Sequence, residues 1–508
     1  MPAGAEVLVV GAGPSGLMAA LELARHGVAA RLVERAPAPH RQARATAIQP
    51  GTLEILAAAG VAGRFLDASE HLEFARVVDG DLRPLSESAL AGTGGHWEVQ
   101  CSLPQWRTEQ ILAGRLAELG GTVEHGVTVV SLEPDGDGVL AGLEYAGGRT
   151  GTSRVRWVVG AGGAHSVTRE SLDEELAGQT YPGQALAADV AVSCGLPRDG
   201  SALIATAAGY VLLAPLPGQR WITFVGDLDP AEKAWLSAAG GGPQAAAELV
   251  RRALERRTGG AVTVDDIGWA AEFRMHRRLA PHLAGPRRFL LGDAGHLSSP
   301  FGGEGLNSGL HDASNLAWKL SLELRGRARP DLLASYQAER GAAAQHVIEA
   351  SDQVHELAHG AVETARTGVA AAPLPSDQAA ALARARAMLD TSYAASPLTG
   401  EFTGPGGSVR PSPAPGERYP DRVELAGPRH HLLAFGLPPG DGLDELGRRW
   451  RGLVDVVRAD GDPGRAGLRG PGLVLVRPDG YVGFRAAPAG PAALAALDEH
   501  LNRYLIPA

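Results

Sequence analysis

The sequence predicts an α/β protein in which a mostly parallel sheet is divided by an inserted antiparallel sheet and followed by a smaller C-terminal unit. Three observations lead to this fold class. A strand, a helix and a second strand follow one another from Val7, strand-like runs dominate residues 181–280, and a stretch rich in Gly and Pro at 396–415 precedes a further strand pair. Alternating strands and helices favour a parallel sheet, whereas consecutive strands favour an antiparallel one.

The first strand leads into a glycine-rich turn, Gly11-Ala-Gly13-Pro14-Ser15-Gly16. In this spacing the first glycine permits a tight turn, the second lets the backbone approach a pyrophosphate, and the third lets the following helix pack on the sheet. That helix stops at Gly27, and a second strand, 28–33, ends at Glu34 and Arg35. An acid at this place accepts hydrogen bonds from an adenosine ribose, so the segment predicts a dinucleotide without a 2′-phosphate.

A second glycine segment lies far along the chain. The apolar run 289–291 delivers Gly292 and Asp293 to the carboxyl end of a strand, where open α/β sheets bind ligands and a carboxylate can hold a polyol hydroxyl. Residues 300–307 then offer backbone N–H groups and the start of a helix with an apolar stripe. We interpret the two segments as two walls of one cofactor site.

A third motif, Gly160-Ala-Gly162-Gly163-Ala-His-Ser166-Val-Thr-Arg169, lies between them. With the three motifs in this order, residues 5–350 resemble the single-component, class A FAD-dependent aromatic monooxygenases, and most of all the bacterial aromatic polyketide hydroxylases and phenol hydroxylases. The resemblance implies FAD as cofactor, NADPH or NADH as reductant and O₂ as co-substrate. It also implies a Rossmann-like FAD-binding domain, a substrate-binding sheet and a thioredoxin-like C-terminal domain.

The glycine segments and the resemblance together give the candidate site. The expected FAD contacts are Gly11, Gly13, Pro14, Ser15, Gly16, Glu34, Arg35, Arg44, Gln105, Gly162, Asp293, Pro300, Gly303, Gly305, Leu306 and Asn307. The residues expected nearest the reaction are Pro300, Gly302 and Arg44. Candidate substrate contacts are four aromatic residues of the inserted sheet, for which a plain core role is the alternative: Tyr210, Trp221, Phe224 and Trp269.

One position departs from the family pattern. Members usually carry Asp-Gly in the middle motif, and this chain has Gly162-Gly163. The family's aspartate is associated with both FAD and the pyridine nucleotide, so its replacement removes a carboxylate from the place where hydride transfer is organised. We expect FAD binding to survive through its other contacts and NADPH handling to be the property affected.

The resemblance implies hydroxylation of an aromatic, polycyclic polyketide-type substrate through a flavin C4a-hydroperoxide, with water excluded from the site. Two alternatives within the same fold stay open. The flavin chemistry could end in a Baeyer–Villiger or epoxidation product, or the substrate itself could reduce FAD without NADPH. Composition and spacing do not separate these reactions, because they differ in substrate geometry and in the hydride donor.

The expected domain boundaries follow the changes of pattern along the chain. Residues 1–180 and 281–392 form a discontinuous FAD-binding domain with a helical extension, 181–280 the substrate-binding sheet, 396–415 a linker and 416–508 the thioredoxin-like domain. Pro478-Asp479-Gly480 is a good hairpin turn between two strands of that last domain. The domain contains no cysteine, which excludes a dithiol role and favours packing or contact in a homodimer.

A competing motif, His355-Glu356-Leu-Ala-His359, matches the H-E-x-x-H pattern of zinc hydrolases. Gly360 follows at once, no third ligand is evident in the sequence, and a chance match is easy in a chain with 16 histidines. We therefore expect a solvated helix face rather than a metal site.

Bulk properties indicate a cytoplasmic enzyme with a small-molecule substrate. The net charge of −10 argues against nucleic acid and anionic membranes as partners. No apolar run approaches the roughly 20 residues of a membrane span, and the N-terminus shows no export signal. The chain has only two cysteines, Cys101 and Cys194, which suits a reducing compartment.

Overall fold

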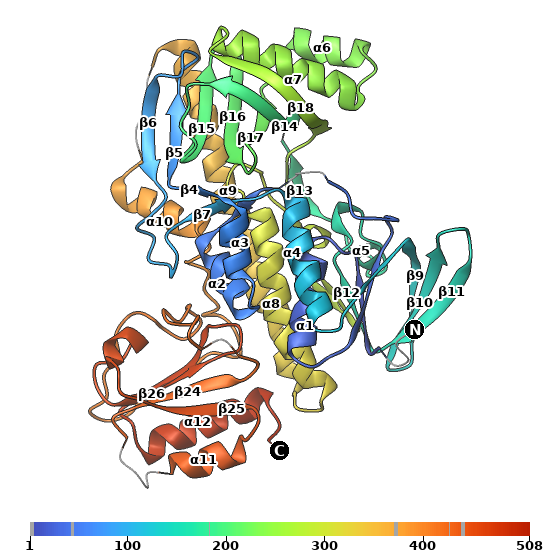
Figure 1. Cartoon of the computed structure of the whole chain (residues 1–508). Helices are drawn as coiled ribbons and strands as arrows, with labels where there is room; N and C mark the ends of the chain where they lie inside the picture. Colours follow the sequence, from blue (N-terminus) through green and yellow to red (C-terminus); the bar gives the residue numbers. More distant parts are fainter. Residues whose placement is uncertain are drawn as a thin grey trace.

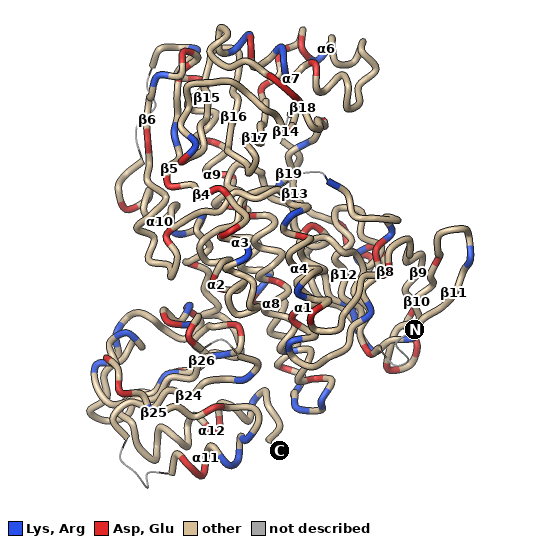
Figure 2. Tube along the Cα trace, viewed as in Figure 1, with Lys and Arg blue, Asp and Glu red and all other residues tan. Residues whose placement is uncertain are grey.

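The computed structural model of the chain describes residues 5–41, 45–181, 183–369, 374–425, 427–437 and 442–507. Figure 1 shows three parts: a central sheet with its helices, a second sheet above it, and a C-terminal unit below. Basic and acidic residues are interspersed along the trace in all three parts (Figure 2). Of the described helices, none is both long and apolar enough to cross a membrane.

The central sheet is parallel except at one edge. Its order is β20-β21-β12-β1-β2-β8, with only β20 antiparallel. The strands are β1 (Val7–Val10), β2 (Ala30–Glu34), β8 (Val123–His125), β12 (Trp157–Gly160), β20 (Ala284–Gly285) and β21 (Arg288–Leu290). Such a sheet must be covered on both faces, which explains why all four residues of β1 are buried.

Side chains of β1 alternate between two separate cores. Val7 and Val9 pack in the core with α1 (Pro14–Arg25), α4 (Gln105–Glu118) and α8 (Gly305–Leu324). Leu8 and Val10 pack against a three-stranded meander on the opposite face. The meander consists of β9 (Val127–Asp135), β10 (Gly138–Tyr145) and β11 (Thr150–Val155). The first helix ends as its sequence predicts, with Gly27 at φ +73°.

The second sheet has seven strands in the order β18-β14-β17-β16-β15-β5-β6. The inserted segment supplies β14 (Ala185–Cys194), β15 (Gly200–Thr206), β16 (Gly209–Leu216), β17 (Arg220–Gly226) and β18 (Val262–Phe273). The sheet is not confined to residues 181–280, because β5 (Phe74–Val78) pairs in parallel with β15, and β6 (Pro84–Ala89) follows it. Two helices that the sequence analysis did not anticipate, α6 (Pro230–Ala238) and α7 (Gly242–Thr258), cover its outer face.

One long helix, α9 (Pro330–Thr367), touches all three parts of the molecule (Figure 1). Its 38 residues span roughly 57 Å at 1.5 Å per residue. Leu332 at its start packs in the C-terminal core, whereas Ala358 and Val362 near its end pack under the second sheet. The helix therefore fixes the two outer parts relative to the central one.

In its described residues the C-terminal unit is a five-stranded sheet of order β23-β27-β26-β24-β25 with two α-helices. Its elements are β23 (Gly400–Thr403), β24 (His430–Phe435), α11 (Leu443–Arg449), β25 (Val454–Ala459), β26 (Gly472–Val476), β27 (Val482–Ala487) and α12 (Pro491–Tyr504). The segment 396–415 is more than a linker, since it contributes β23, which pairs with β27. The expected hairpin joins β26 and β27, with Gly480 at φ +81°.

Short elements complete the described fold around the central sheet. They are β3 (Ala47–Ile48), α2 (Pro50–Ala58), α3 (Ala62–Ala68), β4 (Glu70–Leu72), β7 (Gln100–Ser102), α5 (Val167–Glu170), β13 (Ala177–Thr180), β19 (His276–Leu279), β22 (His296–Leu297) and α10 (Ser376–Arg386). Two of the small sheets, β3-β7-β4 and β13-β19-β22, connect the central part to the second sheet.

Candidate active site

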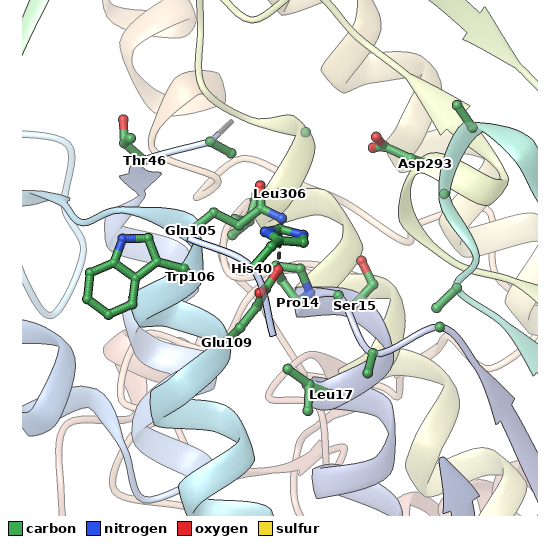
Figure 3. Close-up of a pocket in the computed structure, with 18 of the residues that line it drawn as sticks. Pro14, Ser15, Leu17, His40, Thr46, Gln105, Trp106, Glu109, Asp293 and Leu306 are labelled. Carbon is green, nitrogen blue, oxygen red and sulfur yellow. Dashed lines mark hydrogen bonds between the residues drawn. The ribbon is translucent and has the colours of Figure 1, made fainter. Parts of the chain in front are cut away.

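A cavity of about 1500 Å³ extends from the carboxyl ends of the central strands to the inner face of the second sheet. Both glycine segments line it, as do the end of β2 and the start of α4. Figure 3 shows Pro14 and Ser15 from the first segment and Asp293 and Leu306 from the second around this space. The structure therefore brings together the two segments that the sequence analysis paired.

The first turn is built by glycines with different tasks. Gly11 has φ +99°, and a Cβ there would overlap the carbonyl oxygen of Ala161. A Cβ on Gly16 would overlap the carbonyl oxygen of Gly11, so Gly16 serves the packing of α1 and does not line the cavity. Gly13 is different, because a Cβ there would meet no atom within 4 Å and would project into open space at the N-terminus of α1. This open cradle fits a pyrophosphate.

The acid at the end of β2 is already oriented by the backbone. Glu34 accepts hydrogen bonds from the N–H groups of Ala12 and Ala36, each at 2.9 Å. Glu34 and Arg35 both line the cavity. Gln105 at the start of α4 lines it too and donates to Glu109 Oε1 at 2.9 Å (Figure 3). These groups line the same cavity as the first glycine turn.

The backbone at Gly162 does not require glycine. Its φ and ψ are −75° and 8°, and a Cβ there would come no closer than 3.6 Å to another atom. Gly163 does require a glycine-like conformation, with φ +76°. A Cβ at position 162 would therefore meet no steric obstacle, and Gly162 itself lines the cavity. The backbone therefore gives no reason for a glycine at position 162.

A buried ionic network supports the turn at Gly292, which has φ +55°. The N–H of Gly292 donates to Asp312 Oδ2 at 2.9 Å, and the ring of His296 contacts the same oxygen at 2.8 Å. Arg340 Nε donates to Asp312 Oδ1 at 2.7 Å. Burial opposes ionisation of Asp312, but the charge of Arg340 and the contact with His296 hold its pKa well below the usual range. His296 is thus part of the support beneath Asp293, which itself lies exposed in the cavity wall.

Asn307 lies behind the cavity wall. It accepts from the N–H of Gln49 at 3.0 Å and donates to the carbonyl oxygens of Ala47 and Gly303 at 2.9 and 2.6 Å. Its amide is therefore occupied in tying β3 to the 300–306 loop, and Asn307 is not among the residues that line the cavity. Pro300, Gly302, Gly303, Gly305 and Leu306 do line the cavity. Arg44 falls outside the described residues.

The same loop carries a buried acid that the sequence analysis missed. Glu304 is fully buried, and neither carboxylate oxygen has a hydrogen-bond partner among the described residues. A Cβ on Gly302 would overlap this carboxylate, so the side chain lies directly against the cavity-lining loop. Burial raises the pKa of Glu304 to about 7, against a smaller opposing effect of Arg386.

The second sheet presents every other side chain to the cavity. The cavity-facing residues of β16 and β17 are Leu212, Ala214, Ile222 and Phe224. Trp221 has the opposite parity and lies on the other face, in the core that also contains Leu249 and Val250 of α7. Of the four aromatic candidates, Phe224 is the one in the cavity wall, whereas Trp221 belongs to the core of the sheet and its helices.

The other two aromatic residues lie on the inner face without lining the cavity. Tyr210 is covered by Phe301, whose ring centroid is 5.1 Å away, and by the end of α9. Trp269 packs against Ala214, Ile222 and their neighbours. Both residues therefore pack beside the cavity, because the inner face of the second sheet extends beyond the part that lines it.

The histidines of the H-E-x-x-H motif lie on α9 behind the cavity loop. Their ring centroids are 4.5 Å apart, and His355 also packs on Tyr181 and Phe301. His359 approaches Asp227 at 3.4 Å, whereas Glu356 is exposed. In the described part of the chain no group of three His, Cys, Asp or Glu side chains is arranged to hold a metal ion.

Comparisons with known proteins agree with this geometry. Residues 4–351 match the FAD binding domain family, and residues 413–508 match the aromatic-ring hydroxylase C-terminal family. The chain is 33% identical to 6-methylpretetramide 4-monooxygenase of Streptomyces rimosus over 97% of this chain and 93% of that protein. It is 32% identical to pentachlorophenol 4-monooxygenase of Sphingobium chlorophenolicum over 73% of this chain and 68% of that protein.

Solved structures with the same fold include two hydroxylases. Aklavinone-11 hydroxylase in a ternary complex with FAD and aklavinone has a TM-score of 0.80 and 25% identity, covering 98% of both chains. Anhydrotetracycline hydroxylase from Streptomyces rimosus has a TM-score of 0.74 and 27% identity, covering 99% of both chains. Fold and site thus define an FAD-binding monooxygenase. The chain belongs to the family of FAD-dependent aromatic-ring hydroxylases, which confirms the resemblance noted in the sequence and the prediction of FAD as cofactor.

Proposed function

We propose that this enzyme uses NADPH or NADH and O₂ to hydroxylate a polycyclic, polyketide-type aromatic substrate. The observation that carries the proposal is the single cavity shared by the two glycine segments and the apolar face of the second sheet. Its volume of about 1500 Å³ exceeds the roughly 300–1,000 Å³ that is typical of a pocket for one drug-sized ligand. A cofactor and a flat second ligand can therefore occupy it together. Relatives named for 6-methylpretetramide and aklavinone support a polycyclic substrate.

The chain offers groups for each part of FAD. The open cradle at Gly13 and the N-terminus of α1 would hold the pyrophosphate, and Glu34 the adenosine ribose. Asp293 would hold the ribityl hydroxyls, and the 300–306 loop would face the isoalloxazine ring. When bound, FAD supplies the transfer of electrons from the nicotinamide to O₂. The protein's contribution is to place the substrate against the ring and to exclude water with the sheet residues around Phe224.

The C-terminal unit is proposed to be thioredoxin-like. In support, β24 and β25 are parallel and joined through α11, while β26 and β27 form an antiparallel hairpin followed by α12. The unit has no cysteine, so it does not act as a dithiol. We further propose a cytoplasmic homodimer in which this unit packs or makes subunit contacts, and the mass of the particle measured by light scattering tests the dimer.

The replacement of the family aspartate by Gly162 favours one second candidate, an oxidation in which the substrate reduces FAD directly. Anaerobic mixing separates the two reactions. Hydroxylation predicts that NADPH bleaches the flavin absorbance, faster when a phenolic polycycle is present, and that the polycycle alone does not. Bleaching by the polycycle alone would favour the oxidation. If NADPH bleaching is slow, Gly162→Asp should accelerate it, because that change supplies the carboxylate expected from the family resemblance. The backbone allows the change, since a Cβ at this position meets no close atom.

A further inference from the structure

The cavity wall carries charges from two different directions. Glu34 and Arg35 come from the end of β2 and the residue after it, and Glu109 comes from α4. One cation, Arg386, comes instead from the last residue of α10 and lies with the loop that contains Gly302 and Glu304. This loop leads to Phe301, which packs on the second sheet. Arg386 therefore belongs to a different structural element from the charged residues that are proposed to bind the nucleotide.

The end of α10 is held firmly in place. The N–H of Gly51 at the start of α2 donates to the carbonyl oxygen of Ala387 at 2.8 Å. On the same helix, Leu382 and Ala385 pack against residues of α9. An arginine carried by so constrained a helix end has its backbone position fixed before any ligand arrives, which lowers the entropic cost of binding.

No partner in the described chain occupies the Arg386 guanidinium. Its Nε is buried without a hydrogen-bond acceptor, and no described residue forms an ion pair with it. Its neighbour Arg384 serves as an internal contrast, because Arg384 donates to the carbonyl oxygen of Thr93 at 2.7 Å and does not line the cavity. A buried, unpaired donor on a cation is costly, so such a group in a cavity wall indicates a ligand that completes it.

Glu304, the acid on which the charge of Arg386 acts, does not provide the missing hydrogen-bond acceptor. Glu304 forms no ion pair with Arg386, and burial raises the pKa of Glu304 to about 7. A carboxyl with this pKa is only partly ionised at neutral pH, and without an ion pair it does not serve as the partner of the Arg386 guanidinium. The residues of β16 and β17 that line the same cavity, among them Leu212 and Phe224, carry no charge.

We propose that Arg386 is a specificity-determining residue that binds an anionic oxygen of the aromatic substrate. The proposal rests on the function proposed above and adds to it the chemical class of the substrate: a polycycle that carries a phenolate, an enolate or a carboxylate. The ring system lies on the apolar sheet face, and its anionic oxygen accepts hydrogen bonds from the guanidinium. Arg386 thereby fixes which edge of the ring system is turned toward α10.

The test uses oxidised FAD holoenzyme and two probes that differ only in charge, anthraquinone-2-carboxylate and anthraquinone-2-carboxamide. Their dissociation constants are measured from the perturbation of flavin absorbance and fluorescence, without turnover. Wild type should bind the carboxylate about 10- to 100-fold more tightly, as expected for a hydrogen bond to a charged group. In Arg386→Met this preference should vanish while carboxamide binding stays the same, and Arg386→Lys should retain part of it.

Arg384→Met is the matched control on the same helix and should keep the wild-type preference. Equal affinities in wild type, no measurable carboxylate binding at millimolar concentration, or an unchanged preference in Arg386→Met would overturn the proposal. The oxygenation of a phenolic polycycle is followed separately in the same preparations. Loss of charge preference with oxygenation intact refutes only the role of Arg386. Charge preference without oxygenation refutes the proposed function and leaves the anion site standing.

Discussion

Arg340 Nε lies 2.7 Å from Asp312 Oδ1, and both side chains are fully buried beneath the turn that presents Asp293 to the cavity. The other oxygen of Asp312 accepts from the N–H of Gly292. Arg340 also donates to the hydroxyl of Tyr393, which precedes the C-terminal sheet. The pair therefore links the turn at Gly292 to α8, to α9 and, through Tyr393, to the segment that precedes the C-terminal sheet.

Removing one partner of this pair should lower both the free energy of unfolding and the FAD content of the protein. Arg340→Met leaves the Asp312 charge buried without its main counter-charge, and we expect a loss of about 3–5 kcal/mol in the free energy of unfolding, together with reduced FAD content. Denaturant unfolding and flavin absorbance measure the two effects. The control is Arg252→Met, which removes an exposed pair with Glu248 and should cost no more than about 0.5 kcal/mol. Equal effects of the two variants would contradict this account.

Substitutions of two glycines in the turn from Gly11 to Gly16 should have different effects. Gly13→Val places its side chain in open space at the start of α1, so the apoprotein should fold normally but bind little FAD. Gly16→Ala places a Cβ on the carbonyl of Gly11, so this variant should lose thermal stability even without FAD. Apoprotein melting by circular dichroism and flavin content after reconstitution distinguish them. Full FAD occupancy in the Gly13→Val protein would show that the pyrophosphate does not bind at Gly13.

Stability should depend on pH through Glu304. Its folded-state pKa of about 7 lies above the ordinary value of about 4.3, so the folded state binds the proton more tightly than the unfolded one. The resulting stabilisation is fully present below about pH 4, declines as pH rises, and is lost above about pH 7, amounting to on the order of 3 kcal/mol. Glu304→Gln removes this contribution, so its unfolding free energy should fall less than that of wild type between pH 5 and pH 8. Parallel pH profiles for the two proteins would mean that Glu304 ionises normally.

The two faces of β17 should give opposite phenotypes. Phe224→Ala enlarges the cavity, so a polycyclic ligand should bind more weakly, with only a small change in stability. Trp221→Ala opens the core against α7 and should cost about 3–5 kcal/mol in unfolding free energy. Ligand titration of the holoenzyme and denaturant unfolding test this pair. If Trp221→Ala selectively weakened ligand binding in a stable protein, the parity derived from the strand would be contradicted.

Local patterns in the sequence predicted those parts of the site that obey local rules. The turn from Gly11 to Gly16, Glu34 at the end of β2 and the hairpin at Pro478–Gly480 each depend on a few neighbouring residues, and all have the expected conformation or place. The order of the two glycine segments was sufficient to expect one shared cavity, because carboxyl ends of parallel strands lie at one edge of a sheet.

Long-range relationships were not accessible in this way. The pairing of β5 with β15 joins residues more than a hundred positions apart, and the sequence of residues 74–78 does not indicate which strand they pair with. Alternation along β17 predicts that Trp221 and Phe224 face opposite ways, but not which face meets the cavity. Arg340 and Arg386 are ordinary helix arginines in the sequence, and their roles arise only when α9 and α10 pack behind the cavity.

Isotope labelling of the transferred oxygen atom tests whether the enzyme is a hydroxylase. Wild-type holoenzyme, NADPH and ¹⁸O₂ are incubated with aklavinone or 6-methylpretetramide, the compounds in the names of the relatives, and the products are analysed by mass spectrometry. We expect a product that gains one ¹⁸O atom per NADPH consumed, and no such product when Gly13→Val protein lacking FAD is used. A product whose mass shows loss of two hydrogens, or whose new oxygen comes from water, would contradict the proposed hydroxylation.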